Sequence, residues 1–218
     1  MSNITYDYIE KYLKSLIVEE KDVLREMEVF AHENSVPIVQ KETARFLELM
    51  INLKKPKKIL ELGAAIGYSS ILMCLSSNMQ SEIVTVERSE KMIELANENI
   101  KKYNLEKKIE IVQGECIEVL ENLDEKFDMI FMDAGKGHYN HYLPHCLRLL
   151  EDDGVIIADN VLFKGMVATD ELVKRRKITI VKRMRKYLED INDSSKFVTT
   201  VIPMGDGIAV TMRRERND

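Results

Sequence analysis

Five short apolar runs alternate with longer segments of helical periodicity along this chain, and no other feature limits its possible folds as strongly. The most apolar run has its core at Met129–Met132, as expected for a strand covered on both faces, and it stops at Asp133. Strands that alternate with helices form a parallel sheet through right-handed crossovers. We therefore predict a doubly wound α/β fold in which all these strands end at one edge.

Each element of this pattern can be located on the chain, together with a C-terminal hairpin and an N-terminal helical region. The predicted strands cover residues 58–62, 83–86, 109–112, 127–132, 154–158, 196–202 and 207–212, and the predicted helices cover residues 4–33, 43–53, 69–75, 90–103, 116–120, 143–150 and 170–191. The first helical segment is expected to be a helix pair outside the sheet, serving either as packing or also as a lid or dimer element. We predict a single domain over residues 1–218, with a helical extension at 1–53 and the core at 57–218.

The composition is that of an ordinary soluble globular protein. Of 218 residues, 45% are hydrophobic and 32% are charged, and the net charge of −5 gives no general attraction for nucleic acid or anionic membranes. No apolar run reaches the length of a membrane span, and the polar N-terminus lacks signal-peptide features. Cys74, Cys116 and Cys146 lie far apart without a CxxC pair, which favours a cytoplasmic location and argues against a disulfide framework or a cysteine zinc site.

A glycine-containing turn follows the first predicted strand and opens a helix, an arrangement that lets a cofactor approach the backbone closely. The turn contains Gly63 and Gly67, but Ala65 and Tyr68 stand where a dinucleotide-binding GxGxxG loop needs glycines, and no Gly-Lys-Ser/Thr of a P-loop follows. Glu87 ends the second strand, where an acid can accept hydrogen bonds from ribose hydroxyls. Singly, these are also common structural features, but together they predict a nucleoside-type cofactor without a pyrophosphate.

Polar side chains follow two of the buried strands. Asp133 and Lys136 come after one of them, and Asp159 and Asn160 come after another. Ligands bind beyond the carboxyl ends of parallel strands, so these side chains are expected to meet there. Two carboxylates and an amide oxygen form a hard oxygen donor set that suits Mg²⁺ rather than Zn²⁺. The alternative, from residue types alone, is that they are ordinary turn residues.

Three histidines, His138, His141 and His145, raise the alternative of a zinc site. His141 and His145 have the i,i+4 spacing of a helical zinc-binding pair, but no glutamate follows His141. In addition, Pro144 is expected to interrupt the helix. We therefore interpret these three residues as surface or substrate-edge histidines.

A strongly basic segment lies shortly after Asp159 and Asn160 in this otherwise acidic chain. No acid interrupts its basic residues, which are Lys174, Arg175, Arg176, Lys177, Lys182, Arg183, Arg185 and Lys186. A charge run of this kind is usually a solvated helix face, but beside an active-site edge it also suits a polyanion such as RNA. The predicted RNA contacts are Lys174, Arg175, Arg176, Lys177, Lys182 and Arg183.

Five stretches of the chain carry a family resemblance: ELGAAIGYSS, IVTVE, FMDAGK, IIADN and IPMGDGIAV. With these motifs the chain resembles the class I S-adenosylmethionine-dependent methyltransferases, and more closely the cation-dependent O-methyltransferases that include catechol and caffeoyl-CoA methyltransferases. The resemblance extends from about residue 35 to the C-terminus. It implies a Rossmann-like fold with a seven-stranded, mostly parallel sheet, a C-terminal antiparallel hairpin, extra N-terminal helices, and S-adenosylmethionine as the cofactor.

The resemblance also implies roles for particular residues. The cofactor would be bound by Val39, Glu61, Gly63, Gly67, Ser69, Glu87, Glu115, Cys116 and Asp133, a divalent cation would be bound by Asp133, Asp159 and Asn160, and the catalytic residues would be Lys136 and Asp133. In that arrangement Ser69 lies along the methionine part of the cofactor, Glu87 at the ribose and Cys116 near the adenine. Mg²⁺ binds a substrate hydroxyl and its neighbouring oxygen, and Lys136 accepts the hydroxyl proton before methyl transfer.

Within the family, the chain most resembles the bacterial branch that methylates 5-hydroxyuridine in the tRNA anticodon loop to 5-methoxyuridine. The basic segment and the stretch DNVLFKGMV support this prediction, and such a base must be unstacked to react. A small catechol or phenol is the second candidate acceptor. A non-catalytic RNA-binding module is a third hypothesis, but a pure binder does not need the strand-end carboxylates and lysine. The family also implies a homodimer, formed through the N-terminal helices.

Overall fold

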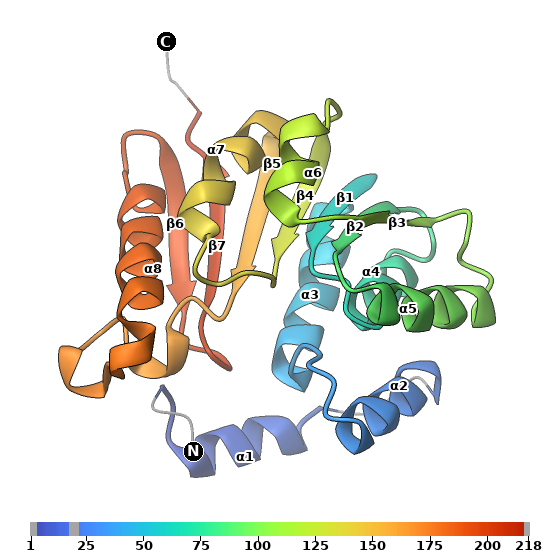
Figure 1. Ribbon diagram of the computed structural model, residues 1–218, viewed down its shortest axis with the longest axis horizontal. Helices are drawn as coiled ribbons and strands as arrows, with labels where there is room; N and C mark the ends of the chain where they lie inside the picture. The colour runs from blue at the N-terminus through green and yellow to red at the C-terminus, as the bar shows by residue number, and fades with distance from the viewer. Residues whose placement is uncertain (1–3, 18–21, 216–218) are drawn as a thin grey trace.

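Seven strands make up one sheet in the part of the chain that the structure, a computed structural model, describes, which is residues 4–17 and 22–215. They are β1 (Lys58–Leu62), β2 (Glu82–Glu87), β3 (Ile109–Gln113), β4 (Phe127–Met132), β5 (Leu150–Asp159), β6 (Phe197–Ile202) and β7 (Ile208–Arg213). Their order is β3-β2-β1-β4-β5-β7-β6, with β1 to β5 parallel and β7 antiparallel to both of its neighbours (Figure 1). The predicted doubly wound α/β fold with a C-terminal antiparallel hairpin is therefore confirmed.

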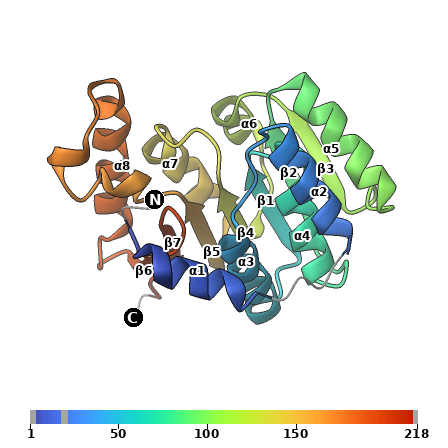
Figure 2. The ribbon, with the colours of Figure 1, turned by 90° about the horizontal axis from the view of Figure 1, so that it is seen from below.

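Helices cover both faces of this sheet. The α-helices are α1 (Asp7–Ser15), α2 (Asp22–Glu33), α3 (Lys41–Lys54), α4 (Tyr68–Ser76), α5 (Glu90–Lys102), α6 (Cys116–Asn122), α7 (Tyr139–Leu149) and α8 (Ile178–Ile191), and the short 3₁₀ helices are η1 (Phe163–Gly165), η2 (Asp170–Leu172) and η3 (Arg175–Lys177). The helices α3, α4 and α5 pack on one face, and α6, α7 and α8 pack on the other (Figure 2). The helices α1 and α2 lie near the edge where the parallel strands end (Figure 1).

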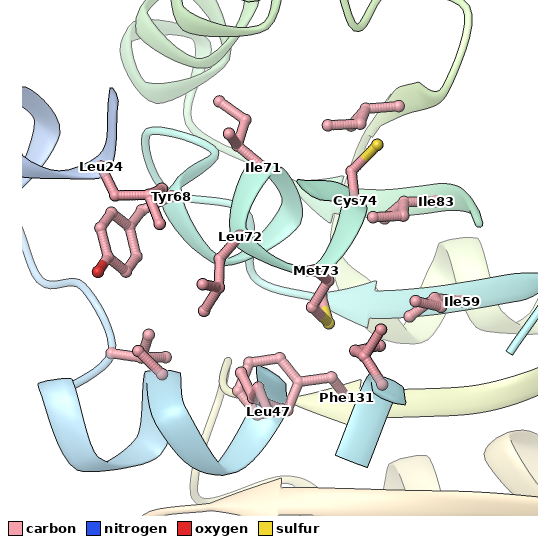
Figure 3. Packing of buried hydrophobic residues seen from close by; sticks show 14 of the residues in the cluster. Leu24, Leu47, Ile59, Tyr68, Ile71, Leu72, Met73, Cys74, Ile83 and Phe131 are labelled. Atoms are coloured by element: carbon pink, nitrogen blue, oxygen red, sulfur yellow. The ribbon is translucent and has the colours of Figure 1, made fainter. Parts of the chain in front are cut away.

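The core between the sheet and the helices α3 and α4 fixes the neighbouring strands β1 and β4. Ile59 of β1 and Phe131 of β4 face the same side of the sheet, where they meet Leu47 of α3 and Met73 of α4 (Figure 3). All four side chains are fully buried. Burial of such a side chain stabilises the fold by about 1.5–3 kcal/mol. This packing holds the ends of β1 and β4, and therefore the loops that follow them, in fixed positions.

The prediction that Pro144 interrupts a helix is wrong. The helix α7 begins at Tyr139, earlier than the predicted residue 143, and continues through Pro144 to Leu149. A proline inside a helix removes one backbone hydrogen bond and crowds the preceding turn. That cost is offset by the burial of apolar side chains along α7, which are Tyr139, Tyr142, Leu143, Cys146 and Leu149.

The prediction of one continuous helix over residues 170–191 is also wrong. The short helices η2 and η3 are separate from α8, which begins only at Ile178. The backbone of Val173 and Lys174 is extended, which separates η2 from η3. The basic residues 174–177 therefore lie on η3 and its N-cap, in front of α8 rather than on one of its faces.

The N-terminal region contains the predicted helix pair, α1 and α2, while residues 18–21 between them lie outside the described residues. No residue of α1 is buried. Polar contacts join this region to the rest of the chain, since Thr5 Oγ1 donates to the Pro203 carbonyl at 3.1 Å and Lys14 Nζ lies 3.5 Å from Glu42 Oε1. Among the described helices, none combines the length and apolar character needed to cross a membrane.

The strand order places a crevice between β1 and β4, where the chain changes the direction in which it adds strands. Gly63 follows β1 and Ala134 follows β4. A Cβ atom added to Gly63 would lie 2.8 Å from the Cβ of Ala134, and the φ angle of Gly63 is +104°. Both the close approach and the positive φ require glycine here. The two loops thus meet at the carboxyl edge of the sheet, where a ligand is expected.

Candidate active site

Two adjoining pockets lie at this edge and share Gly63, Glu87 and Ala134 in their walls. The first pocket has a volume of about 380 Å³ and is lined by the start of α3 and by the loops after β1, β4 and β5. The second pocket has a volume of about 780 Å³ and is lined by the loops after β2 and β3 and by residues of α7 and α8. Because three residues belong to both walls, the pockets form neighbouring parts of one binding edge.

Most of the residues predicted to bind the cofactor line these pockets. Those in the wall of the first pocket are Val39, Gly63, Ser69, Glu87 and Asp133, and those in the wall of the second are Gly63, Glu87, Glu115 and Cys116. The two remaining predicted residues, Glu61 and Gly67, line neither pocket.

Glu61 and Gly67 instead support the glycine turn from behind. Glu61 is fully buried, accepts hydrogen bonds from the hydroxyls of Ser70 and, at 2.6 Å, of Thr85, and has its pKa raised by burial. Gly67 has a φ of +79° at the start of α4, where an added Cβ would lie 3.4 Å from the Cβ of Ala96. The geometry gives these two residues a supporting place behind the pocket wall.

Glu87 connects the second strand to the glycine turn. Its Oε2 accepts a hydrogen bond from the Ala65 N–H at 3.0 Å, and its Oε1 accepts from the N–H groups of Arg88 and Ser89, each at 2.9 Å. A carboxylate has about four lone-pair sites, so Glu87 can still accept hydrogen bonds from a ligand. Its position in both pocket walls suits a ligand that extends from one pocket into the other.

The predicted strand-end residues meet in the wall of the first pocket, which contains Asp133, Lys136, Asp159 and Asn160. Asn160 links them, because its Nδ2 donates to Asp133 Oδ1 at 3.0 Å and its Oδ1 accepts from Lys136 Nζ at 2.6 Å. The backbone N–H of Asn160 donates to Asp159 Oδ1 at 2.6 Å, and its φ is +63°, in the left-handed region that asparagine tolerates. The loops after β4 and β5 thus form a single polar cluster.

The two carboxylates of this cluster are poorly solvated. Burial raises the pKa of Asp133, and burial together with the neighbouring Asp133 carboxylate raises the pKa of Asp159. A divalent cation would offset this cost, and the carboxylate and amide oxygens present are the donors that Mg²⁺ accepts. In the described residues no group of three or more His, Cys, Asp and Glu side chains is arranged to hold a metal. The predicted magnesium set is of another kind, since it contains two carboxylates and an amide.

The structure adds Asp206, to which the sequence analysis assigned no role. This residue follows the Pro203–Gly205 turn and lines the first pocket, where burial raises its pKa. It accepts a hydrogen bond from the backbone N–H of Lys164, which fixes the loop after Asn160 against the β6–β7 turn. The motif IPMGDGIAV contained the signal, because an acid between two glycines at a tight turn has little purpose in packing.

The second pocket combines charged and apolar groups. Arg88 Nη1 and Glu115 Oε1 form an exposed ion pair of 3.1 Å at its rim. Cys116 lies deeper, and burial raises the pKa of its thiol to about 11. A thiol in this state is not a nucleophile at neutral pH, so Cys116 offers a small apolar surface and its backbone rather than reactivity.

The three histidines of the zinc alternative also line the second pocket. The rings of His138 and His141 lie 6.0 Å apart, and burial, followed by the nearby Arg183, lowers the pKa of His138. His141 and His145 both lie on α7. These positions agree with an edge of a binding pocket, and the geometry offers no support for zinc.

The basic segment divides into exposed and structurally engaged residues. Lys174, Arg175, Arg176 and Lys182 are exposed. The Nζ of Lys177 lies 5.8 Å from the centroid of the Phe163 ring. The remaining basic residues have partners within the fold: Arg183 donates to the Gly137 carbonyl at 3.2 Å, Arg185 donates to the Val167 carbonyl at 2.9 Å and pairs with Asp170, and Lys186 pairs with Asp190.

Comparison with known proteins agrees with this arrangement. A sequence model of the O-methyltransferase family matches residues 14–214. A catechol O-methyltransferase from Niastella koreensis is 34% identical over 173 residues, which cover 77% of this chain and 78% of that protein. A caffeoyl-CoA O-methyltransferase from Medicago sativa is 28% identical over 224 residues, covering 97% and 89% of the two chains.

A solved structure resembles the fold closely. The O-methyltransferase from Bacillus cereus, in complex with SAH, has a TM-score of 0.83 and 26% identity, over 97% of this chain and 100% of that one. The match of the family model and the identity to the Niastella koreensis relative both extend over most of the chain. The chain therefore belongs to the O-methyltransferase family, and the cation-dependent O-methyltransferase family predicted from its motifs is confirmed.

Proposed function

We propose that this protein transfers the methyl group of S-adenosylmethionine to a hydroxyl oxygen that has a second oxygen beside it, with a divalent cation as the second cofactor. The observation that carries this proposal is the hydrogen-bonded cluster of Asp133, Lys136, Asp159 and Asn160 in the first pocket, next to the glycine turn. The Bacillus cereus relative in complex with SAH supports the choice of methyl donor.

The cofactor would extend across both pockets. Its methionine part would lie in the first pocket near Val39 and Ser69, and its adenine would lie in the second near Glu115 and Cys116. Glu87, in both walls, would accept hydrogen bonds from the ribose hydroxyls. Because Glu87 is already held by three backbone N–H groups, it would bind the ribose without first being ordered.

Asp133, Asp159 and Asn160 would hold the divalent cation. When bound, the cation supplies a Lewis acid that lowers the pKa of the acceptor hydroxyl. Lys136 Nζ, 2.6 Å from Asn160 Oδ1, would take the hydroxyl proton. The walls of the first pocket would hold the acceptor oxygen and the sulfonium methyl group together, and this proximity supplies much of the rate.

The acceptor that we propose is 5-hydroxyuridine in a tRNA anticodon loop. Its 5-hydroxyl and the adjacent ring carbonyl provide the two neighbouring oxygens. The exposed residues Lys174, Arg175 and Arg176 support this choice, because they precede α8, whose Arg183 lines the second pocket, and could contact phosphates. The base would leave its stack to enter the first pocket.

A small catechol is the second candidate acceptor, and one observation favours it. The Niastella koreensis relative, 34% identical to this chain, is a catechol O-methyltransferase. A catechol has two adjacent hydroxyl oxygens and suits the same cluster, but it makes no use of the basic segment. A non-catalytic RNA-binding module, the third hypothesis, would use the basic segment and leave the strand-end cluster without a role.

We also propose that two copies of the chain associate through the N-terminal helices. Apolar side chains of α1 and of its C-cap residue are exposed, among them Tyr8, Tyr12 and Leu16. Light scattering after size exclusion would test this proposal. A dimer that dissociates in a Tyr12→Glu, Leu16→Glu variant would support it, and a wild-type monomer at micromolar concentration would contradict it.

The function is tested by methyl transfer from labelled S-adenosylmethionine with Mg²⁺, with and without a chelator. One set of reactions contains tRNA carrying 5-hydroxyuridine, and the other contains catechol. Chelator-sensitive labelling of tRNA, well above that of catechol, is the expected result. Labelling of catechol alone would assign a small-molecule acceptor, labelling unaffected by chelator would remove the cation, and tRNA binding without any labelling would favour the non-catalytic module.

A further inference from the structure

Thr43 carries a buried hydroxyl in the wall of the first pocket, and this hydroxyl has no hydrogen-bond partner in the part of the chain that the structure describes. Its exposed fraction is 0%, and its Oγ1 makes no hydrogen bond within the described residues. Buried polar side chains are nearly always paired in folded proteins, because an unpaired hydroxyl loses its hydration without compensation. A hydroxyl of this kind in the wall of a pocket leaves one hydrogen bond for a bound ligand to make.

The position of Thr43 indicates which end of the pocket it serves. An atom at the Cβ position of Gly205 would lie 3.7 Å from Thr43 Oγ1 and 3.6 Å from Gln40 Oε1. Gly205 immediately precedes Asp206, which lines the same pocket as Lys136. Thr43 and Gln40 therefore face the β6–β7 turn at the acceptor end of the pocket.

The chemistry of the two side chains limits what they can recognise. The threonine hydroxyl donates one hydrogen bond and accepts others, and the glutamine amide has a carbonyl acceptor and an NH₂ donor. Such a pair is complementary to a ring edge on which carbonyl oxygens and an N–H alternate. A catechol has only C–H groups on the rest of its ring, so it would leave the buried Thr43 hydroxyl without a partner.

We propose that Thr43 and Gln40 form a polar wall that binds the carbonyl and N–H edge of a heterocyclic acceptor and so selects a hydroxylated pyrimidine over a catechol. This inference rests on the proposed function, because it assumes that the acceptor is methylated in the first pocket. A site built to hydrogen-bond its substrate discriminates strongly against an analogue that lacks those groups, since its own polar groups then stay unpaired.

The test uses Thr43→Val, which removes the hydroxyl with little change in shape, and Thr43→Ser, which keeps it. The acceptors are free 5-hydroxyuridine and catechol, and Thr200→Val, on the exposed side of β6, is the matched control. We expect Thr43→Val to lower kcat/KM for 5-hydroxyuridine by roughly tenfold, and Thr43→Ser to restore most of it. The kcat/KM for catechol and the Kd for S-adenosylmethionine should not change. Gln40→Met should act in the same direction as Thr43→Val.

Several outcomes would overturn the inference. If Thr43→Val weakens binding of S-adenosylmethionine, or lowers activity equally for both acceptors, the hydroxyl serves the cofactor or the fold instead. If the wild-type enzyme methylates 5-hydroxyuridine and Thr43→Val does so equally well, only this inference fails and the proposed function stands. If methylation of free 5-hydroxyuridine requires Thr43 but tRNA is not labelled, the inference about Thr43 and Gln40 is supported and the tRNA assignment fails.

Calorimetric binding of 5-hydroxyuridine decides the inference without turnover. The measurement uses the enzyme with Mg²⁺ and SAH, which has no methyl group to transfer, and it compares the wild-type protein with Thr43→Val. A roughly tenfold weaker binding of 5-hydroxyuridine to the variant supports the wall. Equal binding overturns it, and so does a wild-type enzyme that binds catechol but not 5-hydroxyuridine.

Discussion

The strand-end cluster and the basic segment lie at the same edge of the sheet but are built in opposite ways. In the cluster, Asp159 is 4% exposed, and Asn160 is bonded to both Asp133 and Lys136. In the basic segment, Lys174, Arg175 and Arg176 are exposed at the start of the short 3₁₀ helix η3. The difference teaches that side chains proposed for chemistry are fixed by buried strands, whereas those proposed for a large flexible partner can remain free in solvent.

Arg183 belongs to the basic segment in sequence and to the strand-end cluster in structure. It belongs to the basic run in sequence, yet its guanidinium donates to the Gly137 carbonyl, one residue after Lys136. An added Cβ at Gly137 would lie 3.2 Å from the Ile180 side chain, so α8 packs directly against the lysine loop. Part of the basic run therefore belongs to the framework of the cluster.

The largest expected effect concerns the cluster itself. Lys136→Ala should lower kcat by roughly 100- to 10,000-fold, because a positioned general base typically contributes that much. Calorimetry should show the Kd for S-adenosylmethionine unchanged. Lys136→Arg is the control, since arginine keeps the positive charge but cannot take up a proton. Wild-type turnover in either variant would remove Lys136 from the mechanism.

Removing charge from the exposed segment should affect only the large acceptor. In the triple variant Lys174→Ala, Arg175→Ala, Arg176→Ala, we expect kcat/KM for tRNA to fall by roughly tenfold to a hundredfold at low salt. The slope of log affinity against log salt should also decrease by about 2 to 3, as for three lost phosphate contacts. Catechol turnover should be unaffected. The matched control replaces three exposed lysines elsewhere: Lys57, Lys101 and Lys107. An equal loss in the control would mean that no specific RNA surface exists.

Replacing Arg183 distinguishes a role in positioning the lysine loop from a role in RNA binding. If it positions the lysine loop, Arg183→Ala should lower kcat by roughly tenfold for tRNA and catechol alike, because one charge-assisted hydrogen bond is lost. Lys182→Ala, which changes the exposed neighbour on the same helix, should affect only tRNA. A kcat that stays unchanged for both acceptors, with weaker tRNA binding, would return Arg183 to its predicted role as an RNA contact.

The smallest expected effect concerns Glu61, behind the glycine turn, and the pH dependence of the free energy of unfolding. Burial raises the pKa of Glu61 above its ordinary value of 4.5, so the native protein keeps a proton that the unfolded chain loses. This contribution to stability is complete below pH 4.5 and is lost as the pH rises through the folded pKa. Glutamine does not titrate. The free energy of unfolding of the wild-type protein, relative to Glu61→Gln, should therefore fall as the pH rises above 4.5. A difference independent of pH would show that Glu61 is not perturbed.

Much of the fold could be predicted because strand and helix signals are local. The uniformly apolar Met129–Met132 marks a buried strand by itself, and Asp133 marks its end. The errors arose where tertiary packing outweighs local preference. Pro144 stays inside α7 because the burial of its neighbours offsets a lost hydrogen bond. The helix α8 begins only at Ile178, because the backbone of Val173 and Lys174 is extended in the folded chain.

The sequence by itself determined the doubly wound fold and the carboxyl edge at which Asp133, Lys136, Asp159 and Asn160 meet. Only the tertiary structure decided which polar groups have partners. Among the described residues, Thr43 Oγ1 has no hydrogen-bond partner, Gln40 and Gly205 face each other, and Arg183 donates to the Gly137 carbonyl. The physical reason is that periodicity and turn chemistry act between near neighbours in the chain. A hydrogen bond between distant residues depends on where whole helices and loops pack, which no local pattern records.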